Sequence, residues 1–254
     1  MGLRVVLFSR VPRWYSFRGE QLATRLAAAG HEVAGVVVER VPTIASFREW
    51  IFKLGLVLVV KKSLAKGLRL LGLKKSAPIK AADPAVTGPA VSPPVFLVDS
   101  HNSPASVEIV RKLRPDVIVL RGCGIIKKPI LEIPTKGTIN PHYALLPAFR
   151  GMDVTEWAAL LGAPVAVSVH YVDEGVDTGA VLTERRIPVE LGDTLGGLRD
   201  KSAAAAVDLL VEVVRLLEAG TTRPVSHQKG EGRQYFVMHP RLRQLANERL
   251  RRAR

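Results

Sequence analysis

The sequence predicts an α/β protein built on a Rossmann-like, mostly parallel sheet with helices on both faces. Short β-branched runs alternate with longer segments of helical periodicity over the first half of the chain. Parallel strands need such crossover helices between them. The chain has 254 residues, of which 47% are hydrophobic, so a large buried core is possible.

The first half supplies the predicted parallel strands and two of their helices. The expected strands are Leu3–Phe8, Glu32–Val38, Val95–Val98 and Val117–Leu120. One helix is expected at Gly19–Ala29. A second helix, Ser103–Leu113, is predicted because Asn102 or Ser103 can cap its first turn.

In the second half the pattern changes. The strands Val165–Tyr171 and Ala180–Val189 are joined by the acidic, glycine-containing loop Asp173–Gly179, which predicts an antiparallel pair added to the sheet. Asp193-Thr194 then caps a long helix, Leu195–Ala219, whose apolar residues recur at helical spacing. This helix is expected to cover the sheet.

Two segments outside the predicted core are strongly basic. Arg48–Lys80 holds nine Lys and Arg against one Glu, and Arg241–Arg254 holds six Arg against one Glu. The first predicts a basic helical insertion at about residues 45–80 that covers the sheet, although a helix resting on an anionic membrane has the same pattern. The second belongs to a basic C-terminal extension, residues 219–254, which follows a main domain of residues 1–218.

Charge and cysteine content exclude several classes of protein. The chain carries 37 Lys and Arg against 23 Asp and Glu, a net charge of +14, which excludes an acidic disordered protein. Its single cysteine, Cys123, excludes a disulfide framework and a multi-cysteine metal site. The apolar run Leu54–Val60 is far shorter than the ~20 residues that span a bilayer. We therefore expect a cytoplasmic protein with no transmembrane segment.

Polar side chains gather where two predicted strands end. The segment Ile139–Gly151 reads Ile-Asn-Pro-His-Tyr-Ala-Leu-Leu-Pro-Ala-Phe-Arg-Gly. Asn140 and His142 are two residues apart, so their side chains point the same way from an extended strand. An amide and an imidazole at the carboxyl end of a strand of an α/β sheet predict a ligand site. Taken alone, the pair could also be a loop amide and a structural histidine.

These residues resemble the signature of the formyltransferase family, whose members act on methionyl-tRNA, phosphoribosylglycinamide or nucleotide sugars. The family motif is Asn, any residue, His, then Pro-Ser-Leu-Leu-Pro and later Arg-Gly. A second motif, a strand ending in His followed by one residue and Val-Asp-Glu-Gly-Val-Asp-Thr-Gly, is matched by His170–Gly179. Ile118–Ile126 also resembles the family segment that runs along the folate. The similarity covers residues 1–218 and implies the formyltransferase fold.

The resemblance implies that Asn140, His142 and Asp177 are catalytic, with 10-formyltetrahydrofolate as co-substrate and no metal. When an amine attacks the formyl carbon, negative charge develops on the formyl oxygen, and the Asn140 amide can donate to it. His142 can stabilise the same oxygen and carry protons toward the departing folate nitrogen. We expect Asp177 to orient His142 and to raise its pKa into the neutral range.

The resemblance also implies a folate slot between two loops. The residues expected to line it are Gly122, Cys123, Gly124, Ile125, Ile126, Val172, Asp173, Glu174, Gly175 and Val176. Gly124 and Gly175 would permit a close approach of the backbone to the folate. Cys123 is expected to pack beside the slot rather than to react. His170, within a strand, is expected to be structural or to support a catalytic residue.

Departures from the family motifs bear on the acceptor. Tyr143 and Ala144 replace the usual Pro-Ser, and Ser9–Trp14 lacks the glycine-rich turn of enzymes that act on phosphoribosylglycinamide. The extension 219–254 is too short for the C-terminal barrel of the tRNA enzymes. We therefore expect the primary amine of a small molecule, with a nucleotide-linked amino sugar favoured. The candidate contacts to an acceptor phosphate are Arg10, Arg13 and Arg150.

Two other functions remain open. The charge of +14 and the C-terminal arginines are compatible with a methionyl-tRNA formyltransferase-like or RNA-binding protein. This nucleic-acid function is not favoured, because the arginine-rich segment lacks interleaved aromatic residues. With water as the acceptor, the same site would make a formyltetrahydrofolate hydrolase. The sequence also leaves the oligomeric state open, a homodimer included.

Overall fold

The computed structural model describes residues 2–10, 17–40, 92–228 and 230–252. The predicted basic helical insertion at about 45–80, the apolar run Leu54–Val60 and the candidate phosphate contact Arg13 lie outside these ranges. The described residues hold both segments that carry the family motifs. They therefore contain the predicted catalytic residues and both predicted folate loops.

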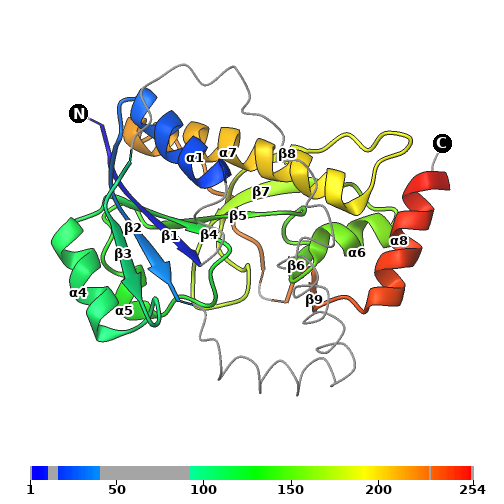
Figure 1. The fold of residues 1–254 in the computed structure, drawn as a ribbon, viewed down its shortest axis with the longest axis horizontal. Coiled ribbons are helices and arrows are strands. Elements are labelled where there is room, and N and C mark those ends of the chain that lie inside the picture. The colour runs from blue at the N-terminus through cyan, green and yellow to red at the C-terminus, as the bar shows by residue number, and fades with distance from the viewer. Residues whose placement is uncertain (1, 11–16, 41–91, 229, 253–254) are drawn as a thin grey trace, which may run out of the picture.

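Seven strands form one sheet in the order β3-β2-β1-β4-β5-β7-β8 (Figure 1). They are β1 (Arg4–Arg10), β2 (Glu32–Glu39), β3 (Val95–Val98), β4 (Val117–Arg121), β5 (Thr138–His142), β7 (Ala166–Tyr171) and β8 (Val181–Arg186). Neighbouring strands from β3 to β5 are parallel, whereas β7 is antiparallel to both β5 and β8. The mostly parallel sheet and its added antiparallel pair are thus confirmed.

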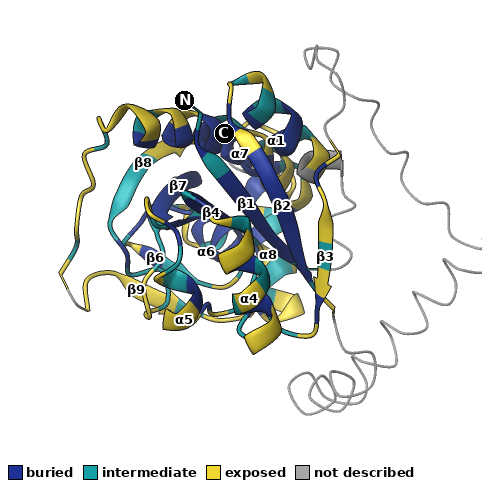
Figure 2. Cartoon of the chain, turned by 90° about the vertical axis from the view of Figure 1, so that its left-hand side faces the viewer, coloured by how far each residue is buried: buried dark blue, intermediate teal, exposed yellow. Residues whose placement is uncertain are grey.

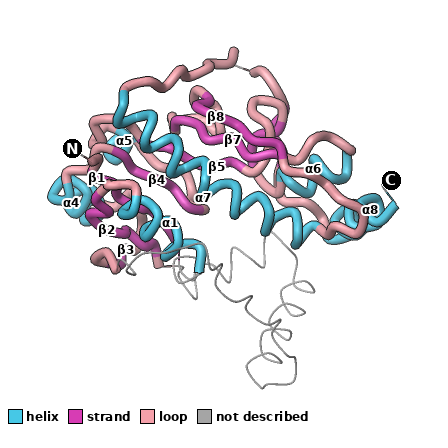
Figure 3. Tube along the Cα trace, turned by 90° about the horizontal axis from the view of Figure 1, so that it is seen from above, coloured by secondary structure: helices cyan, strands magenta, loops and turns pink. Residues whose placement is uncertain are grey.

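Helices cover both faces of the sheet, as predicted. They are α1 (Phe17–Ala28), α4 (Pro104–Leu113), α5 (Lys128–Leu131), α6 (Val154–Leu161), α7 (Leu195–Ala219) and α8 (Pro240–Arg252). Helices α1 and α7 lie side by side over one face, and α4 and α5 lie under the other (Figures 1 and 3). Strand β1 is buried on both sides: Val5 and Leu7 pack toward α1 and α7, and Val6 and Phe8 pack into the opposite cluster (Figure 2).

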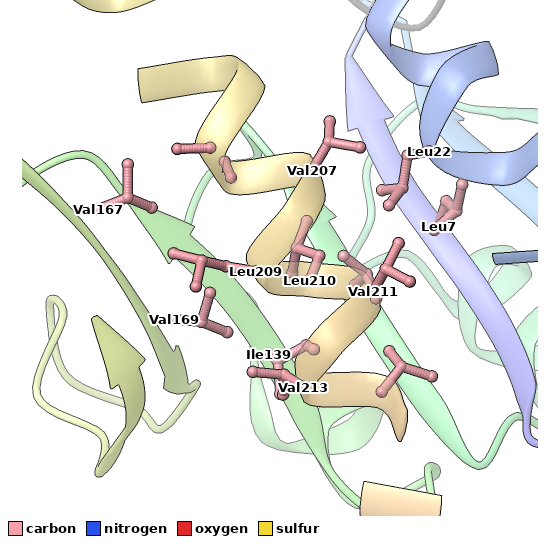
Figure 4. Packing of buried hydrophobic residues seen from close by; sticks show 14 of the residues in the cluster. Leu7, Leu22, Ile139, Val167, Val169, Val207, Leu209, Leu210, Val211 and Val213 are labelled. Carbon is pink, nitrogen blue, oxygen red and sulfur yellow. The ribbon is translucent and has the colours of Figure 1, made fainter. Parts of the chain in front are cut away.

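Local sequence signals set the first residues of helices α4 and α7. Ser103 caps α4, its Oγ accepting from the N–H of Ser106 at 3.2 Å. Thr194 caps α7 in the same way, with the N–H of Gly197 at 3.1 Å. The apolar residues of helix α7 pack against the part of the sheet that β5 and β7 form, where Leu209 and Val213 approach these strands (Figure 4). None of the described helices is long and apolar enough to cross a membrane.

The residues that follow α7 in the chain pack against the same hydrophobic core that α7 covers. Strand β9 (Arg233–Tyr235) pairs in parallel with β6 (Phe149–Gly151) in a separate two-stranded sheet. Helix α8 packs against α6, and its Ala246 and Leu250 are buried in the main hydrophobic cluster. Part of the arginine-rich segment is therefore a packed helix with an apolar side.

Two aromatic contacts and a network of charges fix this C-terminal segment. Tyr235 stacks on Phe149 with ring centroids 5.0 Å apart and lies 5.3 Å from the ring of Trp157. Asp153 accepts from the N–H of Met238 at 2.9 Å, and it pairs with the guanidinium groups of Arg199 and Arg243. These contacts bind the segment that follows β9 to the start of α6.

Gly232→Ala should destabilise the protein by at least ~3 kcal/mol. Gly232 has a φ of +71°, and a Cβ there would overlap the carbonyl oxygen of Pro147, so the strand could no longer lie against β6. The matched control is Gly230→Ala: its φ is +90°, but a Cβ meets nothing within 4 Å. This control should cost only about 1–2 kcal/mol. Urea unfolding of both variants makes the comparison, and equal losses would contradict the close packing of Gly232.

Candidate active site

The predicted catalytic residues come from β5 and from the loop after β7. Asn140 and His142 lie on β5, and Asn140 is paired across the strands with His170 of β7. Asp177 lies in the loop Asp173–Gly179 with a φ of +52°. Non-glycine residues seldom adopt this left-handed conformation, and such strain is concentrated at functional sites.

The structure brings these side chains into one cluster. The Nδ2 of Asn140 lies 3.2 Å from the Nε2 of His170. The Nδ1 of His142 is 3.5 Å from the Oδ2 of Asp177, and the Nε2 of His170 is 3.5 Å from the Oδ1. Asp177 therefore lies between two imidazoles, whose rings meet edge to face with centroids 6.2 Å apart. Sequence reasoning placed His170 within a strand but did not identify its two partners.

The short strand β6 holds both His142 and Asp177. The Nε2 of His142 donates to the carbonyl oxygen of Phe149 at 2.7 Å, and the N–H of Gly151 donates to the Oδ2 of Asp177 at 2.8 Å. Gly151 has a φ of +97°, and a Cβ there would overlap the carbonyl oxygen of Tyr235 in β9. Glycine is therefore the one residue type that lets β9 approach β6 this closely, and the Arg-Gly pair of the motif places a glycine at this position.

The expectation that Asp177 raises the pKa of His142 is wrong in its net direction. Burial of the ring lowers the pKa of His142 below its ordinary 6.5, and this effect outweighs the opposing effects of Asp177 and the Phe149 carbonyl. The contact to Asp177 is also an ion-pair distance rather than a short hydrogen bond. Burial alone would raise the pKa of Asp177, but His170, His142 and the Gly151 N–H together lower it below 3.8. At neutral pH the site therefore favours a neutral His142 beside an ionised Asp177.

The free energy of unfolding should fall as the pH drops from about 7 toward the lowered pKa of His142. Unfolding frees this imidazole to bind a proton at its ordinary pKa of 6.5, so acid favours the unfolded chain. In His142→Gln, whose amide can still donate to the Phe149 carbonyl, the free energy of unfolding should fall less steeply as the pH drops. The slope of this free energy against pH is the quantity to compare. His31 and His101 also have lowered pKa values, so the difference between the two slopes isolates His142.

Urea unfolding at several pH values between about 5 and 8 measures both slopes. Identical slopes for the wild type and His142→Gln would contradict a lowered pKa of His142. Asp177 contributes its stabilisation fully across this pH range and loses it only in more acidic solution, because its ordinary pKa is 3.8 and its folded pKa is lower still.

The first predicted folate loop, residues 122–126, lies at the carboxyl end of β4. Asn102 anchors it, donating to the carbonyl of Ile125 at 2.8 Å and accepting from the N–H of Lys127 at 2.7 Å. Ile126 is buried, so only its backbone could meet a ligand, whereas the side chain of Ile125 is 65% exposed. A Cβ on Gly124 would lie 2.7 Å from the Nη2 of Arg10, so this glycine makes room for a guanidinium of the same chain.

The second predicted folate loop is ordered by Asp173. Its Oδ1 accepts from the N–H of Gly175 at 3.0 Å and from the hydroxyl of Thr178 at 2.6 Å. Glu174 is exposed. Val172, at the start of this loop, and Cys123, in the first loop, pack against the same hydrophobic cluster. The predicted folate residues thus come from two loops that share one side of the sheet.

The two described candidate phosphate contacts differ in their partners. Arg10 pairs through Nη2 with Glu39 at 2.7 Å. Arg150 lies between Phe149 and Gly151, and no hydrogen-bond partner faces its buried Nε among the described residues. Two cavities, of about 620 and 390 Å³, lie elsewhere: one between α7 and α8, the other beside Pro147 and β8. The described ranges contain no group of three or more His, Cys, Asp or Glu that could hold a metal ion.

Comparison with known proteins adds a family match. The family model described as Formyl transferase matches residues 56–214. A methionyl-tRNA formyltransferase from Syntrophus aciditrophicus (strain SB) is 37% identical over 144 residues, which make up 56% of this chain and 45% of that protein. The chain spans less than half the length of the curated relatives it matches.

Solved structures share the fold. Glycinamide ribonucleotide transformylase 1 from Symbiobacterium toebii superposes with a TM-score of 0.60 at 20% identity, over 89% of this chain and 95% of that one. The formyltransferase PseJ from Anoxybacillus kamchatkensis, solved with UDP-4,6-dideoxy-4-formamido-L-AltNAc and tetrahydrofolate, gives 0.51 at 19% identity, over 92% and 86%. At such identities the likeness is one of fold, and it confirms the predicted architecture.

Proposed function

Because the chain belongs to the formyl transferase family, whose model matches more than half of it, we propose that it moves a formyl group from 10-formyltetrahydrofolate to a primary amine of a small molecule. One observation carries the proposal. Asn140, His142 and Asp177 meet in a single cluster, although they come from two separate motifs of the family. The cluster contains a neutral donor, a neutral base and a carboxylate, which are the groups that an acyl transfer needs.

The residues at the two loops fit a folate. Exposed Ile125 and half-buried Cys123 and Val172 offer apolar surface for a flat ring, and loop backbone groups lie beside them. We propose that residues 122–126 and 172–176 hold the folate there. A folate bound in this way supplies the electrophilic formyl carbon.

Asn140, His142 and Asp177 have distinct roles in the proposed reaction. One N–H of the Asn140 amide donates to His170, so the second is left to donate to the formyl oxygen as that oxygen gains negative charge. The amine nitrogen forms a bond to the formyl carbon, and the bond from that carbon to the folate nitrogen breaks. The neutral His142 and its neighbour Asp177 take up the proton that the amine loses and return it to the departing nitrogen.

We propose a nucleotide-linked amino sugar as the first acceptor to test. The support is the fold likeness to PseJ, which was solved with a nucleotide sugar, and the guanidinium groups of Arg10, at the end of β1, and Arg150, in β6. Methionyl-tRNA is the second acceptor to test, because the curated relatives are methionyl-tRNA formyltransferases.

The test begins with calorimetric titration of the protein with a stable analogue of 10-formyltetrahydrofolate. Mass spectrometry then follows formylation of nucleotide-linked amino sugars, free amino sugars, amino acids and methionyl-tRNA, with one arm that contains no amine. A formylated small molecule supports the proposal. Release of tetrahydrofolate without an amine would indicate a hydrolase. A folded protein that binds RNA in a salt-dependent way but no folate would overturn the proposal.

Arg150→Ala should raise the KM of a phosphorylated acceptor by roughly 10- to 100-fold, with a smaller effect on kcat, because a hydrogen bond to a charged group is worth about 1.5–3 kcal/mol. Arg186→Ala is the control, since Arg186 is exposed at the far end of β8. Steady-state kinetics at saturating folate give both constants. An unchanged acceptor KM would remove Arg150 from the acceptor site.

A further inference from the structure

We infer that His170 is a positioning residue, which accepts one amide N–H of Asn140 through Nε2 and so aims the other N–H at the formyl oxygen. The inference rests on the proposed function and assigns a role to a side chain that is neither part of the catalytic trio nor in the folate loops. His170 is buried, with a side-chain exposure of 3%. It lies directly across from Asn140 in the β5–β7 pairing.

The backbone fixes which nitrogen of His170 carries the proton. Its Nδ1 lies 2.7 Å from the carbonyl oxygen of Tyr171, the next residue in the chain. A carbonyl oxygen can only accept, so Nδ1 must carry the proton. In the neutral ring, Nε2 then has a lone pair and can only accept a hydrogen bond. The Tyr171 carbonyl therefore sets the chemistry at the opposite nitrogen of the ring.

That lone pair determines how the Asn140 amide is turned. An amide presents an oxygen on one side and two N–H groups on the other, and only an N–H can satisfy an accepting Nε2. The 3.2 Å contact between the Nδ2 of Asn140 and the Nε2 of His170 has this sense. With one N–H held in the buried pair, the second N–H of the same nitrogen has a fixed direction. A preset donor loses no orientation when charge develops on the oxygen.

The carboxylate of Asp177 is the competing partner of Nε2, because it would favour a proton on that nitrogen, but it lies farther from Nε2 than the Nδ2 of Asn140 does. The Oδ1 of Asp177 is 3.5 Å from Nε2, longer than a hydrogen bond, while its Oδ2 takes the N–H of Gly151. A neutral His170 leaves the Asp177 carboxylate without a hydrogen bond from Nε2. The amide of Asn140 is then the group that satisfies Nε2, and Asp177 stays available to His142.

Nitrogen NMR of the unliganded protein, labelled with ¹⁵N at histidine, tests the first half of the inference without any activity. His170 is assigned by comparison with His170→Gln. We expect Nδ1 to be protonated and Nε2 to be bare at the pH of the activity assay. A proton on Nε2, alone or on both nitrogens, would overturn the inference. This measurement stands even if no acceptor is found, so failure of the proposed function and failure of this inference remain distinguishable.

Kinetics test the second half. Gln can place a side-chain oxygen where Nε2 lies, and Leu has no acceptor. We expect His170→Leu to lower kcat by about 10²-fold with the KM of the folate nearly unchanged, because a misaimed donor acts on the transition state. His170→Gln should recover most of that loss. If Leu retains wild-type kcat, or if a folded Gln variant is as impaired as Leu, the inference fails.

A double-mutant cycle distinguishes positioning from general structural support. His170 acts through Asn140, so His170→Leu should have little further effect on kcat in an Asn140→Ala background. Losses that multiply would show that His170 acts independently of Asn140 and would overturn the inference. Circular dichroism and the unfolding midpoint of each variant show whether its fold is intact. If the His170→Leu protein is unfolded, the His170→Gln variant and the NMR measurement still test the inference.

Discussion

Asp177→Asn should lower kcat by roughly 10²- to 10⁴-fold, the range typical of a lost acid–base group. The substitution keeps the size of the side chain, and Asn tolerates the left-handed backbone that Asp177 adopts at φ +52°. Its amide oxygen can still accept from the N–H of Gly151. What disappears is the negative charge beside His142 and His170. The loss should therefore fall on turnover and leave the KM of both substrates nearly unchanged.

Steady-state kinetics over a range of both substrates separate these constants. Glu184→Gln is the matched control: it removes one carboxylate charge at an exposed position on β8, outside the cluster and the folate loops. This control should retain wild-type kcat. An Asp177→Asn protein that is folded and turns over as fast as the control would show that the carboxylate takes no part in the chemistry.

Asn140→Ala should lower kcat by about 10²- to 10³-fold, as the removal of an oxyanion donor does elsewhere. Asn140 is half-buried at the carboxyl end of β5, and its amide is the neutral donor of the cluster. The effect belongs to the transition state, because the formyl oxygen acquires its charge only there. Binding of a folate analogue should therefore be nearly unchanged, which calorimetry on the same variant measures.

Thr138→Val is the matched control for Asn140→Ala. Thr138 lies two residues earlier on β5, is 2% exposed, and its buried hydroxyl has no hydrogen-bond partner among the described residues. Valine has the same branched shape, so the strand should fold and the enzyme should keep its activity. If Asn140→Ala and Thr138→Val have equal kcat values, Asn140 is not the oxyanion donor.

The parts of the fold that local patterns encode could be predicted from the sequence. Helix α7 has the predicted bounds, Leu195–Ala219, because a cap at Thr194 and a glycine at 220 bracket an apolar stripe. The parallel strands followed from continuous apolar runs, since β1 and β2 are buried on both faces. The meeting of Asn140 and Asp177 followed from the family motifs rather than from any local pattern.

Features that depend on distant parts of the chain could not be predicted. The three-residue strands β6 and β9 have no periodicity of their own, and they pair across a long separation in sequence. The lowered pKa of His142 arises from burial beneath β6, which the motif itself does not encode. Likewise, the partner of His170 depends on the register of β5 against β7. In each case the missing information lies in the packing of residues far apart in the chain.

The pairing of β6 with β9 has a consequence for how the protein is made. The chain emerges from the ribosome with its N-terminus first, so residues 149–151 emerge long before residues 233–235. Until β9 arrives, the strand that holds His142 and Asp177 lacks its partner and the stack of Tyr235 on Phe149. A nascent chain can thus assemble its sheet while the groups proposed as catalytic remain unorganised. We expect activity on the ribosome to begin only after the C-terminal segment has emerged, well after the sheet becomes protease-resistant.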